Sequence, residues 1–407
     1  GVTPGLNFDE RRRNNEAVNI RGISTIYANA SPLVILDNFP YEGNLSAINP
    51  NDVENITVLK DAAAASIWGA RAGNGVIVIT TKKGRLQQPM RVNLNANVSV
   101  LPKPDFDQLP MMAPSDFIEV ERLLFGKGFY NSREKSPARL LLSPAVELMI
   151  RHRESQLTDA QLEAALQELA SHDVRKDFRR HLYENGINQQ YALNLSGGGE
   201  RMSYYLSGGY DTNSGQLGDP YRRVSLRAEN SYTPFKRLTL HAGVNFAQGT
   251  REYGRPVFSD LRPDASRSLY PYARLADEAG NPVALPRDYR QGYAASAEGM
   301  GLLNWDYVPL LDADGIDHRA EQQQVIVTAG VDVNLFRGLT FLGKYQFARN
   351  QDLSTNLQTL DAYSTRNTIN RFTQVNPDGT LSFAVPRGSI LDTWHNQFGS
   401  HNGRAQL

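Results

Sequence analysis

The sequence NPNDVENITVLKDAAAASIWGARAGNGVIVITTKKG, residues 49–84, determines how the rest of the chain is interpreted. It predicts a strand from Ile56, a short helix over the alanine run 62–65, a glycine turn and a second strand over 76–81. The second strand is apolar on both of its faces, which is typical of a strand buried on both sides. The stretch therefore predicts a compact strand–helix–strand unit.

Small and capping residues predict the turns of this unit. Asp61 is placed to cap the helix and to pair locally with Lys60, and Gly69 lies where the helix is expected to end. Gly73 and Gly75 supply positions that tolerate a positive φ. These glycines precede a strand, whereas the glycines of a phosphate loop follow a strand and open a helix, so a phosphate site is not expected.

The indole of Trp68 lies between the predicted helix and the glycine turn. We expect it to fill the core of the unit, and stacking on a substrate is its alternative role. Upstream, short apolar runs at 18–23 and 33–37 predict two further strands, the first of which carries Arg21 and Gly22. Residues 1–86 are thus expected to form a small α+β domain.

Composition excludes several classes of function. The 407 residues include 43 basic and 43 acidic side chains, so no net charge attracts nucleic acid. The chain has no cysteine, which rules out disulfides and thiolate metal sites. No histidine triad, nucleophile elbow or marked carboxylate pair is found, so we expect no metal, no cofactor and no enzymatic activity. No apolar run reaches the ~18 residues of a membrane helix, yet a membrane β-barrel fits this composition.

From Arg91 onward the sequence alternates apolar and polar residues. Valine, leucine, tyrosine and phenylalanine occupy one face, and asparagine, serine, threonine and lysine occupy the other. Each segment is about ten residues long, the length of a tilted membrane strand. An eighth strand is expected to begin near Ser400. The seven segments lie at 91–101, 191–196, 202–210, 223–229, 238–246, 325–334 and 341–347.

The connections between these segments alternate between short and long. Tight turns lie at 197–200, 233–237 and 336–338, and long loops are expected at 102–188, 251–322 and 353–398. An outer-membrane barrel has short periplasmic turns and longer extracellular loops. Residues 87–407 are therefore predicted to form part of such a barrel. A soluble β-sandwich also has alternating strands, but it does not readily explain long loops on one side only.

The predicted extracellular loops have internal features. Residues 157–169 have helical spacing, and Thr158 with Gln161 forms a capping-box pattern. Four aromatic residues of the loops are candidates for substrate contact, and packing within the loops is an equally good interpretation. These residues are Tyr270, Tyr272, Trp305 and Tyr307.

At this point a family resemblance is clear. The run ENITVLKDAAAASIWGARAGNGVIVITTKKG, with VNIRG and PLVILDN upstream, resembles the plug signature of the SusC/RagA family of TonB-dependent outer-membrane transporters. The segments YALNLSGGG and YYLSGGY resemble the early barrel hairpin of that family. The resemblance implies a 22-stranded barrel with the α+β plug inside its lumen. An eight-stranded barrel holds only side chains, so we interpret the chain as a fragment with the plug and the first seven or eight strands.

The resemblance also implies function. Family members actively import a nutrient, such as an oligosaccharide or peptide, across the outer membrane without changing its bonds. Their partners are a SusD-like surface lipoprotein that covers the barrel, TonB with ExbB and ExbD, membrane lipid and the transported ligand. Arg21 and Arg71 match plug arginines that pair with carboxylates of the barrel wall and lock the plug in place.

Three alternatives remain open on the sequence alone. The first is a transporter that also signals to an anti-sigma factor, which requires an additional N-terminal domain. The second is a passive pore or a surface adhesin built on a barrel. The third is a soluble glycan-binding or hydrolytic sandwich, which the pattern of loop lengths disfavours.

Overall fold

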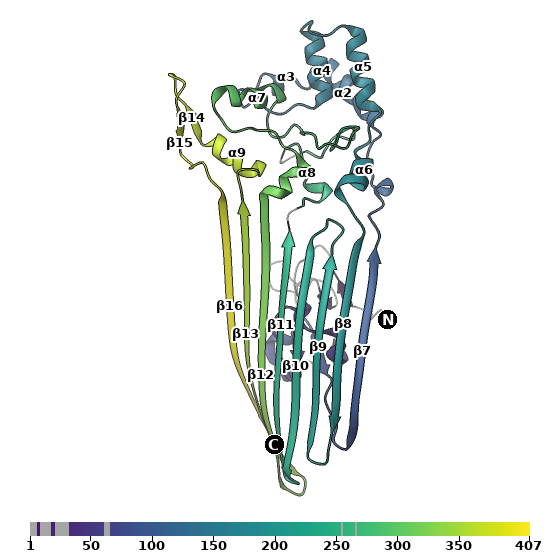
Figure 1. Cartoon of the computed structure of the whole chain (residues 1–407), viewed down its shortest axis with the longest axis vertical. Coiled ribbons are helices and arrows are strands. Elements are labelled where there is room, and N and C mark those ends of the chain that lie inside the picture. Colours follow the sequence, from purple (N-terminus) through teal and green to yellow (C-terminus); the bar gives the residue numbers. More distant parts are fainter. Residues whose placement is uncertain (1–5, 9–17, 21–31, 61–65, 254, 265–266) are drawn as a thin grey trace.

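A computed structural model describes residues 6–8, 18–20, 32–60, 66–253, 255–264 and 267–407. The chain builds a small sheet, a tall antiparallel sheet and a cluster of helical loops at one end of the tall sheet (Figure 1). We refer to the small sheet and its short helices as the plug, and to the tall sheet as the wall.

The plug is organised around the strand predicted over residues 76–81. This strand, β6, pairs in parallel with β3 and antiparallel with β5, and the sheet order is β4-β3-β6-β5. Val76 is fully buried, and Ile77 and Ile79 are also buried, as the apolar run predicts. The elements are β1 (Leu6–Phe8), β2 (Val18–Ile20), β3 (Leu33–Leu36), β4 (Phe39–Pro40), η2 (Leu45–Ala47), η3 (Pro50–Asp52), β5 (Val53–Leu59), η4 (Ser66–Ala72) and β6 (Val76–Thr81).

Of the plug glycines Gly69, Gly73 and Gly75, two have the positive φ that glycine adopts more readily than other residues. Gly69 has a φ of 68° at a kink inside η4, and Gly75 has a φ of 90° just before β6. Gly73 does not have a positive φ, so that part of the prediction is wrong. The alanine run 62–65 and its predicted cap lie outside the described residues.

The wall is a single antiparallel sheet of eight strands in the order β16-β13-β12-β11-β10-β9-β8-β7. Wall strands that follow one another along the chain are also paired side by side in the sheet. In the described part of the chain, β7 and β16 form the two edges of the sheet. Because all eight strands share one sheet, the two-sheet sandwich alternative is wrong. The strands are β7 (Gln88–Leu101), β8 (Gly186–Gly198), β9 (Met202–Ser214), β10 (Pro220–Phe235), β11 (Leu238–Tyr253), β12 (Ile316–Phe336), β13 (Leu339–Gln358) and β16 (Ile390–Gln406).

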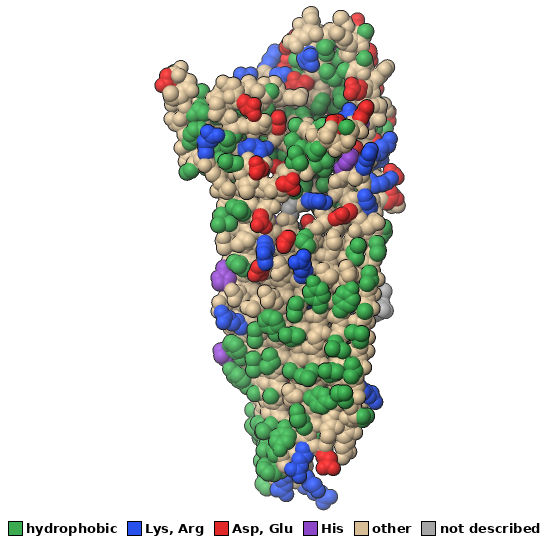
Figure 2. All heavy atoms as spheres, in the orientation of Figure 1, with side chains coloured by type: hydrophobic (Ala, Val, Ile, Leu, Met, Phe, Trp, Pro, Cys, Tyr) green, Lys and Arg blue, Asp and Glu red, His purple; other side chains and the backbone are tan. Residues whose placement is uncertain are grey.

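The two faces of the wall differ as the alternating pattern predicts. On β10, Val224 and Leu226 are 42% and 53% exposed on the outward face, while Arg223 and Arg227 are buried on the face that meets the plug. Figure 2 shows a broad apolar band over the lower half of the wall. This arrangement matches a barrel wall whose outer face contacts lipid and whose inner face is polar.

The wall strands are longer than predicted. They contain 13 to 21 residues rather than about ten, so β12 begins at Ile316 inside the expected loop 251–322, and β13 ends at Gln358 inside 353–398. The last strand begins at Ile390 instead of near Ser400. Alternation marks only the part of a strand that has an apolar outer face. Beyond this part both faces are polar, although the backbone ladder continues.

The long loops fold together above the wall. Their helices share one apolar core, which includes Phe106, Tyr272 and Tyr363 from three different loops. The capping box at Thr158 and Gln161 is confirmed at the start of α5. The loop elements are η5 (Phe106–Gln108), α2 (Pro114–Gly126), α3 (Asn131–Glu134), α4 (Pro144–Arg153), α5 (Asp159–Ala170), α6 (Val174–Asp177), η6 (Phe178–Leu182), η7 (Phe258–Asp260), α7 (Gln291–Ser296), η8 (Glu298–Met300), α8 (Pro309–Asp312), η9 (Ala313–Gly315), α9 (Tyr363–Arg371), β14 (Thr373–Val375) and β15 (Leu381–Phe383).

None of the helices in the described residues has both the length and the apolar character that a membrane-crossing helix needs.

The chain passes from plug to wall at Gly84. A Cβ atom at this position would lie 2.3 Å from the carbonyl oxygen of Tyr204 on β9. Any side chain here would therefore collide with backbone, and only glycine lets the two segments approach so closely. The glycine that ends the opening stretch thus seats the plug against the wall.

Candidate functional site at the plug–wall interface

One strand of the wall provides most of the polar contacts to the plug. On β10, alternate residues face inward, and Arg223, Ser225 and Arg227 each donate to or accept from the plug. Because side chains alternate along a strand, these three form a continuous stripe on one face. All three are less than 9% exposed.

Arg223 holds the plug segment that contains η2 and η3. Its Nη1 donates to the carbonyl oxygen of Ser46, and the carbonyl of Ile48 lies 3.5 Å away. Its Nε and Nη2 reach the Asp211 carboxylate on β9 at 2.7 and 2.6 Å. The Asp211 carboxylate of the wall therefore neutralises the Arg223 guanidinium, and Nη1 of Arg223 donates to backbone carbonyl groups of the plug. We refer to plug residues 44–50 as the apex.

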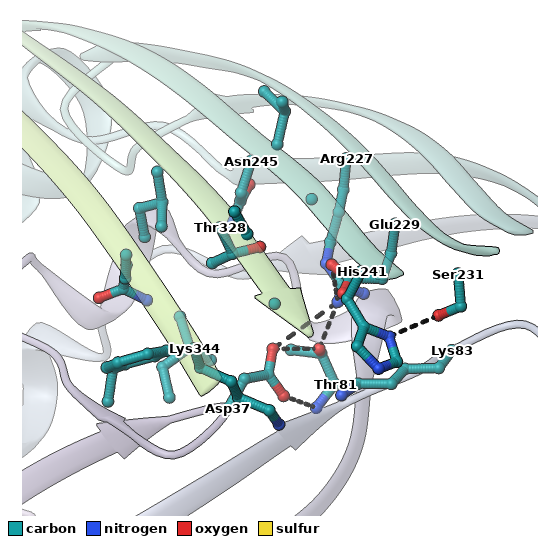
Figure 3. A pocket seen from close by; sticks show the side chains of 18 of the residues that line it. Asp37, Thr81, Lys83, Arg227, Glu229, Ser231, His241, Asn245, Thr328 and Lys344 are labelled. Carbon is teal, nitrogen blue, oxygen red and sulfur yellow. Dashed lines mark hydrogen bonds and ion pairs between the residues drawn. The ribbon is translucent and has the colours of Figure 1, made fainter. Parts of the chain in front are cut away.

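Arg227 holds the opposite end of the plug (Figure 3). Its Nη1 donates to the carbonyl oxygen of Lys82 at 2.8 Å, and its Nη2 donates to the Thr81 hydroxyl at 2.5 Å. The carboxylates of Asp37 and Glu229 lie 3.7 and 3.5 Å from Nη2. With only 5% of its side chain exposed, this guanidinium has almost no access to solvent and depends on these partners.

Further hydrogen bonds join the two parts between these arginines. Each pairs a plug side chain with a wall side chain, and most are buried. They are Asn49 to Ser225 at 3.0 Å, Tyr205 to Asp52 at 2.8 Å, Tyr41 to Gln324 at 3.1 Å and Asn95 to Asn51 at 2.7 Å. We refer to Arg223, Arg227 and the Asn49–Ser225 pair as the plug lock.

Apolar and close backbone contacts complete the interface. Ile326 of β12 is buried in the same core as Val34 and Ile79 of the plug. At Gly209 on β9, a Cβ atom would lie 2.3 Å from Asn49 Nδ2, so the plug lock requires glycine there. At the adjacent Gly208 the nearest atom would be 3.6 Å away, which is ordinary contact.

Two cavities flank the plug lock. The lower one, about 280 Å³, lies beside Arg227 and is lined by both plug and wall (Figure 3). In it, His241 lies 2.8 Å from the Ser231 hydroxyl and 2.9 Å from the Asp332 carboxylate, which ties three adjacent strands together. The upper cavity, about 690 Å³, lies above the apex on the side of the long loops. The plug therefore separates two polar spaces.

The structure places Arg71 beside a carboxylate of the plug. Arg71 donates to Glu42 at 2.8 Å, and its side chain is 59% exposed, so its observed carboxylate partner belongs to the plug and not to the wall. Arg21, Gly22 and Asp61 lie outside the described residues. Lys60 directly follows β5. Among the described residues, the wall arginines that hydrogen-bond to the plug are Arg223 and Arg227 of β10.

Trp68 occupies the place expected of a core residue. It packs against the buried plug cluster of Leu33, Ile35, Ala72 and Val76. The Arg404 guanidinium of β16 lies 5.9 Å from the centre of its ring. The packing role is thus favoured over substrate stacking.

The loop aromatics do not line a binding surface. Tyr270, Tyr272, Trp305 and Tyr307 are only 1% to 6% exposed and belong to the shared loop core. The prediction that they contact substrate is wrong. Aromatic residues bury large areas, and here they hold three loops together, with Tyr307 packed 5.3 Å from the ring of Tyr363.

The sequence contains a partial signal for the plug lock. Arg223 and Arg227 lie four residues apart on the polar face of the weakly alternating segment 223–229, with Ser225 between them on the same face. Buried arginines on one face of a membrane strand require partners inside the lumen. The signal does not identify those partners, because backbone carbonyls of the plug carry no sequence signature.

A buried carboxylate in the loop core makes a prediction about pH. Glu121 of α2 is 5% exposed and accepts hydrogen bonds from Ser143 and Tyr272, both at 2.6 Å. Burial raises the pKa of Glu121 above its usual 4.5, and the two hydrogen bonds and Arg267 oppose this only in part. Protonation therefore favours the folded loops. Their stability should be fully present below pH 4.5 and should fall as the pH rises through the raised pKa.

Hydrogen exchange of the loop amides, corrected for the intrinsic rate at each pH, measures this effect. The Glu121→Gln variant should show a weaker loss of protection between pH 4 and pH 8. An unchanged pH slope in the variant would contradict the assignment to Glu121.

Comparison with known proteins agrees with this architecture. Residues 1–76 match the family model described as TonB-dependent Receptor Plug Domain. The chain is 25% identical over 266 residues to TonB-dependent receptor SusC of Bacteroides thetaiotaomicron, covering 62% of this chain and 22% of that protein. It is 27% identical over 400 residues to TonB-dependent receptor P3 of Formosa agariphila, covering 95% of this chain and 33% of that protein.

A solved structure has the same fold. The RagAB peptide importer in its closed-closed state superimposes with a TM-score of 0.61 at 20% identity, covering 88% of this chain and 39% of the importer chain. The chain thus spans well under half the length of these relatives. Three observations agree with one another. They are the match to the plug-domain model, the plug packed on the polar face of an antiparallel wall, and the similarity in fold to the RagAB importer. Together these findings support a SusC/RagA-type TonB-dependent protein of the outer membrane.

Proposed function

We propose that the protein takes part in TonB-dependent active import of a nutrient, an oligosaccharide or a peptide, across the outer membrane. The observation that carries the proposal is the plug lock, in which buried arginines of the wall bind the backbone of the plug. A plug held by hydrogen bonds and ion pairs is closed at rest and can be opened by force. No bond of the cargo is made or broken.

Arg223 and Arg227 bind opposite ends of the plug. Arg223 holds the apex, which forms the floor of the upper cavity, and Arg227 holds the chain at Lys82. A ligand in the upper cavity contacts the apex directly. Pulling by TonB, driven through ExbB and ExbD, then breaks the hydrogen bonds at the lower end first. Loss of both ends opens a path between the two cavities.

The proposal assigns residues 1–86 to the plug, and 87–407 to the wall and its loops. Arg21 and Arg71 are kept as a second set of locking residues toward wall strands of the full-length protein. The remaining members of the predicted plug motif are Gly22, Lys60, Asp61, Gly69, Gly73 and Gly75. A SusD-like surface lipoprotein is proposed as the partner that covers the extracellular side, which the likeness to SusC and to RagAB supports.

A reversible cross-link tests the proposal because the chain contains no cysteine. Asn49 Nδ2 of the apex lies 3.0 Å from Ser225 Oγ of β10, so these positions face one another across the interface. Asn49→Cys is combined with Ser225→Cys, and disulfide formation between plug and wall is verified by thiol titration before uptake is measured. In cells carrying the full-length protein, oxidation should reduce nutrient uptake at least ten-fold, and reduction should restore it.

Each single cysteine variant is the matched control, and its uptake should be the same under oxidising and reducing conditions. Full uptake with the cross-link formed would contradict the proposal that the plug must move. Uptake that persists without TonB would instead support the passive pore.

A further inference from the structure

The upper cavity has an unusual distribution of charge. Its floor is the apex, and its walls come from β8 to β12. Seven of the fifteen residues that line it have uncharged amide, hydroxyl or phenol side chains. The formal charges on its lining are Asp211, Arg223 and Arg251. Asp211 and Arg223 neutralise one another at 2.6 Å, so Arg251 is left as the source of net charge.

Arg251 is held by aromatic rings. Its guanidinium lies 5.8 Å from the ring centre of Tyr221 and 5.2 Å from that of Tyr253. The Tyr253 ring in turn packs 4.8 Å from His318. In such contacts an aromatic ring packs on the flat face of the guanidinium. The N–H groups lie in the plane of the guanidinium and remain available to donate hydrogen bonds.

No carboxylate among the described residues forms an ion pair with Arg251. Asp219 lies in the turn between β9 and β10. Burial raises the pKa of its carboxyl, and the nearby charges of Arg251 and Arg255 oppose this only in part. A neighbouring cavity of about 100 Å³ shares Tyr221 and Arg223 with the upper cavity, and Glu42 and Asp352 are among the residues that line it. Among the described residues that line the upper cavity itself, Arg251 is the formal charge without an ion-pair partner.

We propose that the upper cavity binds an anionic ligand and that Arg251 receives its carboxylate. This inference rests on the proposed import function and specifies the class of cargo. A guanidinium with free donors binds a planar carboxylate through two parallel hydrogen bonds. The rings of Tyr221 and Tyr253 supply flat apolar surface beside it, and the amides of the apex and β12 supply donors and acceptors for the rest of the ligand. A uronic-acid oligosaccharide and a peptide with a free C-terminus both present this group.

Binding to the purified full-length transporter, measured by calorimetry, tests the proposal with two matched pairs of probes. The first pair is hexagalacturonate and the neutral maltohexaose. The second is a short peptide with a free C-terminus and the same peptide amidated. In at least one pair, the carboxylate form should bind about ten-fold more tightly than the neutral form. The pair that shows the preference identifies the source of the carboxylate.

Variants then assign the preference to one residue. Arg251→Gln should bring the ratio of the two affinities close to one, and Arg251→Lys should keep part of it, because charge remains without the planar fork. The control is Arg222→Gln, at an exposed arginine on the outward face of β10, and it should leave the ratio unchanged.

Equal affinities in the wild-type protein, no binding of either carboxylate probe, or an unchanged ratio in Arg251→Gln would each overturn the inference. These outcomes are distinct from failure of the import proposal. The cross-link between plug and wall tests movement of the plug and does not depend on which ligand binds.

Discussion

Replacing Arg227 with glutamine is expected to release the lower end of the plug and make the outer membrane permeable. Glutamine is too short to reach the Lys82 carbonyl and the Thr81 hydroxyl together, and it leaves the carboxylates of Asp37 and Glu229 without their cation. Removing one partner from a buried ionic network costs about 3–5 kcal/mol. The plug should then be displaced in a measurable fraction of molecules.

Two measurements report this release in the full-length protein. Cells should become sensitive to a large antibiotic that the outer membrane normally excludes, and the amides of β6 should lose at least ten-fold in protection from hydrogen exchange. Arg222→Gln is the matched control, because it removes an exposed arginine from the same strand. If Arg227→Gln retained both the barrier and the exchange protection, Arg227 would not be part of the lock.

Replacing Phe178 with alanine is expected to unfold the extracellular loops without disturbing the wall. Phe178 is 1% exposed, and its ring lies 5.4 Å from that of Phe106 and 5.7 Å from that of Phe258. These contacts join the loop after β7 to the loop after β11. Removing a buried phenylalanine costs about 3–5 kcal/mol, because it removes apolar contact and leaves a cavity.

Limited proteolysis separates the loops from the wall in this experiment. Cleavage within residues 102–185 and 255–315 should become at least ten times faster, while the wall strands stay resistant. Phe129→Ala provides the control, since Phe129 is 66% exposed and its loss should change stability by less than about 0.5 kcal/mol. Equal cleavage rates in the two variants would show that the loops do not share a core.

Local pattern predicted the elements of this protein well. The apolar run 76–81 predicted a strand buried on both sides, and β6 is the centre of the plug sheet. Thr158 and Gln161 predicted the start of α5. The alternating segments predicted a wall with one polar face. In each case the signal and the structure it specifies lie within a few residues of each other.

Prediction failed where a residue's environment is set by distant parts of the chain. The loop tyrosines and Trp305 resemble surface aromatics in the sequence, but they are buried in a core to which all three long loops contribute. The strand ends were misplaced because the polar part of a strand has no alternation to mark it.

The sequence by itself determined that this protein has an α+β plug followed by membrane strands with a polar and an apolar face. Periodicity, glycines and the plug motif are local properties, and they survive in a single sequence. Only the tertiary structure decided how the plug is held. Arg227 lies 145 positions from the Lys82 carbonyl that it binds, and that carbonyl is the same chemical group at every residue. Which backbone group a side chain reaches depends on the packing of plug against wall, and packing emerges only when both parts have folded.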